Sequence, residues 1–260
     1  MTGSLTVVGT GMTVAGQLTL EARACIERAE KLFFLVPDPV TSSWIRSLNR
    51  TAESLLDCYR KGRPRLETYG EMVDRILAPV QDGRRVCAAF YGHPGFFVNP
   101  SHEAIRRTRA QGLEARMLPG ISSLDCLFAD LGIDPGVDGC QIFEATDFLM
   151  HRRRFDPRNK LILLQITSVG VRTWEQEKIW SPEGLQLLVD ELTEVYPRDH
   201  EVVAYEVDPF PVCETRIQRV PLGEIPGCEV SANSTLYVPP FGKAAVDPEM
   251  MRRLGLPLPE

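Results

Sequence analysis

The sequence predicts an α/β fold built from two α/β domains, because short apolar strands alternate with helical segments and the alternation begins twice along the chain. The strands expected in the first half are residues 5–8, 31–36, 86–91 and 114–118. Strands that alternate with helices are typical of a mostly parallel sheet with helices on its faces.

Helical patterns separate these strands. Apolar residues at positions 69, 72, 73, 76, 77 and 80 have helical spacing and predict a helix there. Two further helices are expected over about 19–30 and 101–111. Pro37 and Pro39 are interpreted as the end of the strand over 31–36.

The second half repeats the alternation and then becomes richer in strands. Ser122 and Asp125 resemble a capping box that opens a helix ending at Gly132. Turn signals between the last strands predict antiparallel pairing among them. The other expected elements are helices over 182–195 and about 250–254, and strands over 141–145, 161–166, 201–207, 215–220 and 235–238.

Pro119-Gly120 is the predicted boundary between the two domains, since it separates the two series of elements. Residues 1–118 then form the N-terminal α/β domain and residues 119–242 the C-terminal one, with residues 243–260 as a short tail. A chain of 260 residues is long enough for this division.

Composition excludes several classes of protein. A net charge of −6 argues against nucleic acid as a partner, since nucleic-acid-binding proteins concentrate basic residues on one face. Seven scattered cysteines without a C-x-x-C pair predict neither a disulfide framework nor a metal site. No signal region or membrane-length apolar run is visible, so we expect a cytoplasmic protein that binds no membrane.

The most informative stretch is the strand that stops at Gly92-His93-Pro94-Gly95 and continues into Phe96 and Phe97. Strands of an open α/β sheet present ligand sites at their C-terminal ends. Two glycines with flanking aromatic rings suit a wall against a flat, partly apolar ligand such as adenosine. A tight turn that merely packs on its aromatic residues explains the same pattern, and the spacing alone leaves both interpretations open.

A second candidate is the segment from Tyr59 to Tyr69. Arg65 and Tyr69 are four residues apart at a helix start and share a face, and Tyr59 lies across a loop that contains glycine and proline. The structural alternative places Tyr69 in the apolar stripe and Arg65 in a salt bridge, and the spacing alone favours it. Gly9-x-Gly11 after the first strand is a weak match to a dinucleotide fingerprint, because the third glycine is misplaced.

The motifs together resemble the tetrapyrrole-methylase superfamily of S-adenosylmethionine (SAM)-dependent methyltransferases. The resemblance covers residues 3–241, and its motifs are Val8-Gly9-Thr10-Gly11, the turn after Phe90, Leu118-Pro119-Gly120-Ile121-Ser122-Ser123, Leu164-Gln165 and Ser234-Thr235-Leu236-Tyr237-Val238-Pro239-Pro240. It implies SAM as cofactor, S-adenosylhomocysteine as product, and a cofactor cleft between the domains.

Within that superfamily, the long phrases around the turn resemble the borosin peptide α-N-methyltransferases, which methylate backbone amides of a ribosomal precursor peptide. The phrases are 90–102, Ala115-Arg-Met-Leu-Pro-Gly120 and 125–130, together with Arg65-Leu-x-Thr-Tyr69. The resemblance implies that Tyr59, Arg65 and Tyr69 are catalytic. A further tyrosine of the family is replaced by Leu56. The cofactor contacts it implies are Tyr91, His93, Phe96, Phe97, Ser122, Ser123, Gln165, Tyr205, Ser234 and Thr235.

These residue types suit the chemistry that the resemblance implies. An amide nitrogen is a poor nucleophile because its lone pair is delocalised into the carbonyl group. Tyrosine hydroxyls and an arginine in a dry pocket can stabilise charge on the carbonyl oxygen. A phenol made more acidic by Arg65 can accept the amide proton. We expect Tyr59 or Tyr69 in that role and Arg65 as the electrostatic stabiliser.

The family also bears on the partner. Autocatalytic borosin enzymes continue well beyond the point that corresponds to Pro240, so this chain resembles the split form that acts on a separate precursor peptide. We also expect a homodimer. The alternatives are a methyltransferase for tetrapyrroles or other small molecules, and a catalytically silent module that binds SAM or a peptide.

Overall fold

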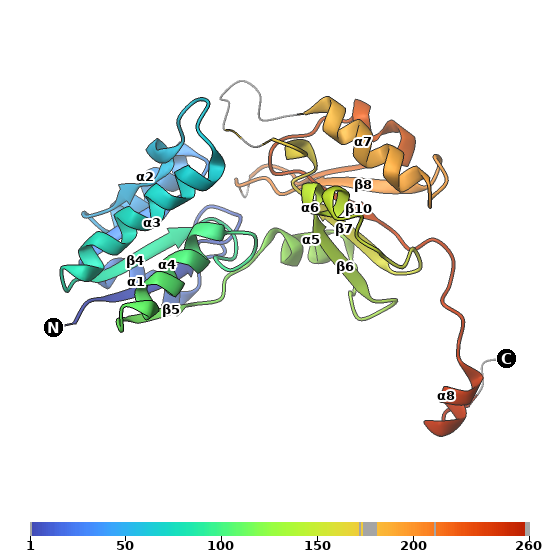
Figure 1. The fold of residues 1–260 in the computed structure, drawn as a ribbon, viewed down its shortest axis with the longest axis horizontal. Helices are drawn as coiled ribbons and strands as arrows, with labels where there is room; N and C mark the ends of the chain where they lie inside the picture. The colour runs from blue at the N-terminus through green and yellow to red at the C-terminus, as the bar shows by residue number, and fades with distance from the viewer. Residues whose placement is uncertain (1, 172, 174–180, 211, 258–260) are drawn as a thin grey trace.

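The computed structural model describes residues 2–171, 173, 181–210 and 212–257, and within them it shows two five-stranded sheets (Figure 1). The strands of the first sheet all precede Pro119, and those of the second all follow it. The segment 118–122 joins the two sets of elements.

The first sheet is parallel throughout, with strand order β3-β2-β4-β1-β5. Apolar residues on both faces of its central strands explain this, because a parallel sheet is covered on both sides. Helices α3 and α4 cover one face of the sheet, where Ile76 of α3 is buried. Helices α1 and α2 cover the other face, where Ile26 of α1 and Ile45 of α2 are buried. The strands are β1 (Ser4–Gly9), β2 (Lys31–Leu35), β3 (Glu53–Ser54), β4 (Arg85–Phe90) and β5 (Glu114–Met117). The helices are α1 (Leu20–Arg28), α2 (Pro39–Leu48), α3 (Arg65–Gln81) and α4 (Asn99–Ala110).

The second sheet is mixed, with strand order β6-β7-β10-β8-β9. Only β6 and β7 pair in parallel, and the remaining neighbours are antiparallel, which confirms the pairing expected from the turn signals. Helices α6 and α7 pack on one face and α5 on the other. The strands are β6 (Cys140–Glu144), β7 (Lys160–Leu164), β8 (Glu201–Glu206), β9 (Arg216–Pro221) and β10 (Thr235–Val238). The helices are α5 (Ser123–Leu131), α6 (Ala145–Met150) and α7 (Pro182–Thr193).

Two helices differ from the sequence prediction. Pro37 and Pro39 were interpreted only as a strand end, but Asp38 caps a helix there, accepting a hydrogen bond from the Thr41 amide at 2.7 Å. Pro39 occupies the first helical turn, where a missing N–H costs nothing. Residue 145 was expected in a strand, but β6 stops at Glu144, whose carboxylate caps α6.

The tail leaves both sheets. Its short helix α8 (Pro248–Arg253) was expected, and Figure 1 shows it well away from the rest of the chain. No buried residue belongs to this helix. Among the helices that the structure describes, none has the length and apolar composition needed to cross a bilayer.

Candidate functional site

The site begins where β1 and β4, adjacent in the parallel sheet, reach their carboxyl ends. In the sheet, β2 and β3 lie beyond β4 on one side of β1, whereas β5 lies on the other side of β1. The direction in which the chain adds strands therefore reverses at this place in the sheet. Ligands of open α/β sheets bind at such a point. The two turns are joined by main-chain bonds, with the Gly92 amide 2.8 Å from the Gly11 oxygen and the Gly11 amide 3.3 Å from the Gly92 oxygen.

Glycine is required at this contact. A Cβ atom added to Gly9 would lie 2.3 Å from the Gly92 oxygen, and one added to Gly120 would lie 3.1 Å from the same oxygen. Three chain segments therefore meet through their main chains, and side chains there would push the segments apart. The glycines of the sequence motif thus serve close packing of turns.

A cavity of about 610 Å³, including its open mouth, lies beside these turns and takes its walls from both sets of elements. Eight of the ten residues predicted to bind cofactor line it: Tyr91, His93, Phe96, Phe97, Ser122, Ser123, Gln165 and Thr235. The structure therefore brings together residues that are up to 144 positions apart in the sequence, from Tyr91 to Thr235.

The turn after β4 is held by short-range bonds. The His93 Nδ1 atom accepts a hydrogen bond from the Gly95 amide at 3.0 Å, and Ser101 donates to the Pro94 carbonyl oxygen. Phe96 and Phe97 pack edge to face, with ring centroids 4.7 Å apart. These contacts fix two aromatic rings at the cavity wall, as a flat ligand would require.

Two wall residues have strained backbones. Phe97 and Gln165 have φ angles of 57° and 58°, although neither is glycine. Residues other than glycine seldom adopt this left-handed backbone conformation, and those that do are concentrated at ligand sites. At Gln165 this conformation ends β7 at Leu164, two residues earlier than the sequence predicted.

Ser122 places a helix terminus at the cavity. Its Oγ accepts a hydrogen bond from the Asp125 amide, and the Asp125 carboxylate accepts one from the Ser122 amide at 2.6 Å. The predicted capping box is thereby confirmed. The amino end of α5, which carries partial positive charge, thus lies where Ser122 and Ser123 meet the cavity.

Ser234 and Tyr205 lie outside the lining of this cavity. The Ser234 hydroxyl donates to Glu206 at 2.8 Å and accepts from the Ser231 amide, so it shapes the turn that carries Thr235. The Tyr205 hydroxyl donates to Asp130 at 2.7 Å. Their direct contact with a cofactor stays a prediction from the family resemblance.

Six lining residues were not predicted. The sequence signal for most of them was adjacency to a predicted residue or motif, since they neighbour Gly11, His93, Phe97, Gln165 or Ser234. They are Met12, Gly92, Val98, Leu164, Ala232 and Asn233.

The three predicted catalytic residues come from one stretch of chain. Tyr59 follows the 3₁₀ turn Leu56–Cys58, whereas Arg65 and Tyr69 lie in the first turns of α3. Tyr59 and Tyr69 lie close enough for their side chains to interact, and Tyr91 is close enough to both for their charges to interact. The structure therefore links the predicted catalytic group to the cavity through Tyr91.

The pKa values of Tyr59 and Tyr91 depend more on burial than on the charge of Arg65. Loss of water raises the pKa of Tyr59 well above its usual value, and the adjacent Tyr69 raises that pKa further. Loss of water around the Tyr91 hydroxyl likewise raises the pKa of that phenol, although the residue as a whole is partly exposed. Arg65 opposes both shifts without reversing them. The expected influence of Arg65 is therefore present, since it lowers the pKa of Tyr59, but burial outweighs it and Tyr59 stays neutral.

Arg65 itself has no carboxylate within ion-pair distance among the described residues. It also occupies the first turn of α3, where a positive charge is unfavourable to the helix. The salt-bridge interpretation weighed for Arg65 therefore fails for the described part of the chain. Leu56, in place of the family tyrosine, is about half exposed.

A second cavity of about 410 Å³ adjoins the first. The two share Met12, Tyr91 and Asn233, and the second is otherwise lined by residues such as Thr10, Pro37 and Asp38. Tyr91 is 39% exposed, and it faces both cavities. The Tyr91 side chain thus contributes to the walls of both cavities. In the described part of the chain, no cluster of three or more His, Cys, Asp or Glu could hold a metal ion.

Comparison with known families gives one match that spans most of the chain. A family model described as tetrapyrrole (corrin/porphyrin) methylases matches residues 4–207. A uroporphyrin-III-C-methyltransferase from Thermus thermophilus has a similar structure, with a TM-score of 0.65 and 20% identity over 92% of this chain and 93% of that one. A precorrin-6Y methylase from Archaeoglobus fulgidus aligns with a TM-score of 0.58 and 18% identity, covering 91% and 97%. Both likenesses concern the fold.

Several curated relatives are more similar in sequence. A methyltransferase and dendrothelin A cyclic peptide precursor from Dendrothele bispora is 40% identical over 97% of this chain, and a gymnopeptides precursor from Gymnopus fusipes is 41% identical over 98%. A type I borosin precursor from Serendipita vermifera is 38% identical over 98%. The chain spans 61–63% of the length of these relatives, whose names join a methyltransferase and a peptide precursor.

Proposed function

Because the chain belongs to the tetrapyrrole methylase family, we propose that it transfers the methyl group of SAM to backbone amide nitrogens of a separate peptide. The family supports methyl transfer, and the borosin-named relatives support a peptide as acceptor. The observation that carries the proposal is that Tyr91, which lines the cavity, lies beside both Tyr59 and Tyr69.

The cavity residues fit SAM by their chemistry. Phe96 and Phe97 offer aromatic surface to an adenine ring, and His93 and Gln165 offer polar atoms beside them. The amino end of α5 at Ser122 suits the carboxylate of the methionine moiety. When bound, SAM supplies an electrophilic methyl group.

The phenols and Arg65 would act on the acceptor amide. Charge that develops on its carbonyl oxygen is stabilised by Arg65, which stays ionised in a dry environment. The amide proton leaves as the N–C bond to the methyl group forms and the sulfur–methyl bond breaks, which releases S-adenosylhomocysteine. In this proposal Tyr69 takes that proton as the phenolate and becomes the neutral phenol, beside the protonated Tyr59. Tyr91 separates the two cavities and orients the acceptor toward the methyl group.

The described tail, including α8, contributes no residue to the lining of the cavity, and we propose a separate peptide as acceptor on the family resemblance. We also propose that the protein works as a homodimer, as the family resemblance implies. Light scattering on the purified chain tests this, and a monomeric mass would contradict it.

The function is tested by intact-mass spectrometry of the purified chain incubated with SAM and an apolar peptide. Successive increases of one CH₂ unit on the peptide, located on backbone nitrogens by fragmentation, are the expected result. Methyl transfer to a porphyrinogen without any change in the peptide would favour the tetrapyrrole alternative. Methylation of the chain itself in the absence of peptide would overturn the separate-acceptor proposal, and SAM binding without any transfer would favour a silent module.

A further inference from the structure

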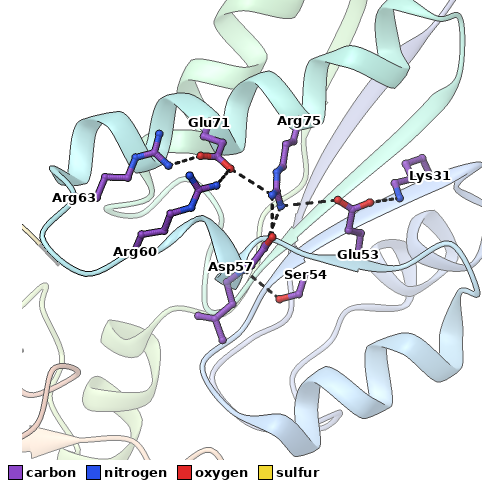
Figure 2. Close-up of polar contacts among 9 residues, drawn as sticks. Lys31, Glu53, Ser54, Asp57, Arg60, Arg63, Glu71 and Arg75 are labelled. Carbon is purple, nitrogen blue, oxygen red and sulfur yellow. Dashed lines mark hydrogen bonds and ion pairs between the residues drawn. The ribbon is translucent and has the colours of Figure 1, made fainter. Parts of the chain in front are cut away.

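The segment that carries Tyr59 is attached to helix α3 by a network of charged side chains (Figure 2). The network contains four basic and four acidic residues, so its charges balance. They are Lys31, Glu53, Asp57, Arg60, Arg63, Glu67, Glu71 and Arg75. Glu71 and Arg75 lie on the same helix as Tyr69, two and six residues further along.

Arg75 makes the most directional contact. Its two terminal nitrogens each donate to one carboxylate oxygen of Asp57, both at 2.8 Å. Such two-pronged pairing fixes orientation as well as distance. The same guanidinium reaches Glu71 at 3.3 Å and Glu53 at 4.0 Å. One side chain of α3 thus holds the turn two residues before Tyr59.

Glu71 holds the other side of Tyr59. Its carboxylate accepts from Arg60 at 2.9 Å and also from Arg63. Figure 2 shows the Arg60 and Arg63 side chains converging on Glu71, while Arg75 turns toward Asp57. The contacts therefore fall on both sides of Tyr59 along the chain, at Asp57 and at Arg60.

These charges persist at neutral pH. Hydrogen bonds from Arg75 lower the pKa of Asp57, and those from Arg63 lower the pKa of Glu71. Single exposed ion pairs contribute little, but here Glu71 and Arg75 are mostly covered and each serves several partners. Leu55 and Cys58, which flank the turn, are fully buried and anchor its inner side.

We propose that Arg75 and Glu71 are positioning residues, which hold the 56–63 segment against α3 so that the Tyr59 hydroxyl stays beside Tyr69. The inference rests on the proposed function, because it assigns both phenols to the transfer step. Neither Arg75 nor Glu71 lines the cofactor cavity. Their effect is therefore exerted on Tyr59.

The first test is kinetic. Arg75→Gln is expected to lower kcat for peptide methylation roughly tenfold to hundredfold, since small misplacements of reacting groups are costly. The Kd for SAM should stay unchanged, and Arg75→Lys should restore part of the rate. Asp57→Asn removes the other partner of the Arg75–Asp57 ion pair, which is exposed, and should also lower kcat. Arg153→Gln is the matched control, because Arg153 pairs with Asp147 in the same two-pronged way outside the cavity lining.

A second test separates positioning from a general loss of structure. In a Tyr59→Phe background, Arg75→Gln should cause no further loss of kcat, because the group it positions is already gone. An equal, multiplicative loss in both backgrounds would overturn the proposal.

A third test needs no methylation. Burial raises the pKa of the Cys58 thiol to about 11, so this thiol should react slowly with iodoacetamide. Arg75→Gln should speed its alkylation several-fold by loosening the turn, measured by peptide mass spectrometry, whereas Arg153→Gln should not. Removing the Arg75 charge alone would raise the thiol pKa and slow the reaction, so acceleration reports motion. An unchanged rate of Cys58 alkylation in Arg75→Gln would overturn the proposed positioning role of Arg75. This outcome can be read even if the chain methylates no peptide and the proposed function fails.

Discussion

The cofactor cavity and the Tyr59 segment are built by opposite means. None of the lining residues found among the described part of the chain is Asp, Glu, Lys or Arg, and the turns behind them are joined by main-chain hydrogen bonds. The Tyr59 segment is held by ion pairs between arginines and carboxylates. Close-packed main chain fixes the shape of a cavity, whereas ion pairs hold a segment in a way that pH and salt can loosen. The comparison suggests a rigid cofactor side and an adjustable acceptor side.

The largest expected effect lies on the acceptor side. Tyr69→Phe and Arg65→Ala should each lower methyl transfer by at least roughly a hundredfold, because each removes a group that acts on charge or a proton in the transition state. Calorimetry should show that SAM binding persists, since neither residue lines the cofactor cavity. Loss of SAM binding in both variants would mean that this helix face is structural and that the two regions are not separable.

The next effect breaks the cofactor side alone. Gly9→Ala should destabilise the fold by roughly 1–3 kcal/mol and weaken SAM binding, because the new methyl group would meet the Gly92 oxygen. Chemical unfolding and calorimetry measure both changes. Gly227→Ala is the control, since a Cβ atom there meets nothing within 4 Å and should cost less than about 0.5 kcal/mol. Equal effects at both positions would contradict the role given to close packing.

A smaller effect is expected at the start of α5. Ser122→Ala removes the capping hydroxyl and should cost about 1 kcal/mol of unfolding free energy. Because Ser122 also lines the cavity, SAM affinity should fall by a few-fold in the same variant. A stability loss without any change in affinity would restrict Ser122 to capping.

The smallest effect concerns pH. Asp57 and Glu71 have lowered pKa values in the folded chain, so their stabilisation is complete above their unfolded pKa near 4 and is lost as the pH falls below it. Hydrogen exchange in residues 53–63, corrected for intrinsic rates, should therefore accelerate below about pH 4, while the turn after β4 changes less. Equal acceleration in both segments would remove the contrast between them.

Much of this arrangement was predictable from local sequence, and the remainder depended on contacts across the fold. Every strand expected from apolar runs is present, because burial and chain punctuation act locally. Helix α2 was missed because prolines that end a strand also suit a helix start.

The network around Arg75 could not be inferred, since it requires the turn at Asp57 to approach a helix face 18 residues away. The role of Ser234 likewise depends on a contact between segments that are distant in sequence. The motif placed it beside the cavity, but only the fold reveals that its hydroxyl bonds to Glu206. Sequence spacing indicates which segments gather, and tertiary contacts decide which side chains face the ligand.

The glycine contact at the strand ends also constrains how the protein can diversify. Gly9, Gly92 and Gly120 meet through main-chain atoms, so substitutions there alter the framework rather than the choice of substrate. A library designed to change acceptor preference should leave these positions constant. It should vary exposed positions near the proposed catalytic residues, such as Leu56 and Leu66, where side chains can change without disturbing buried contacts. New specificities would then arise on the charged segment while the glycine framework is inherited unchanged.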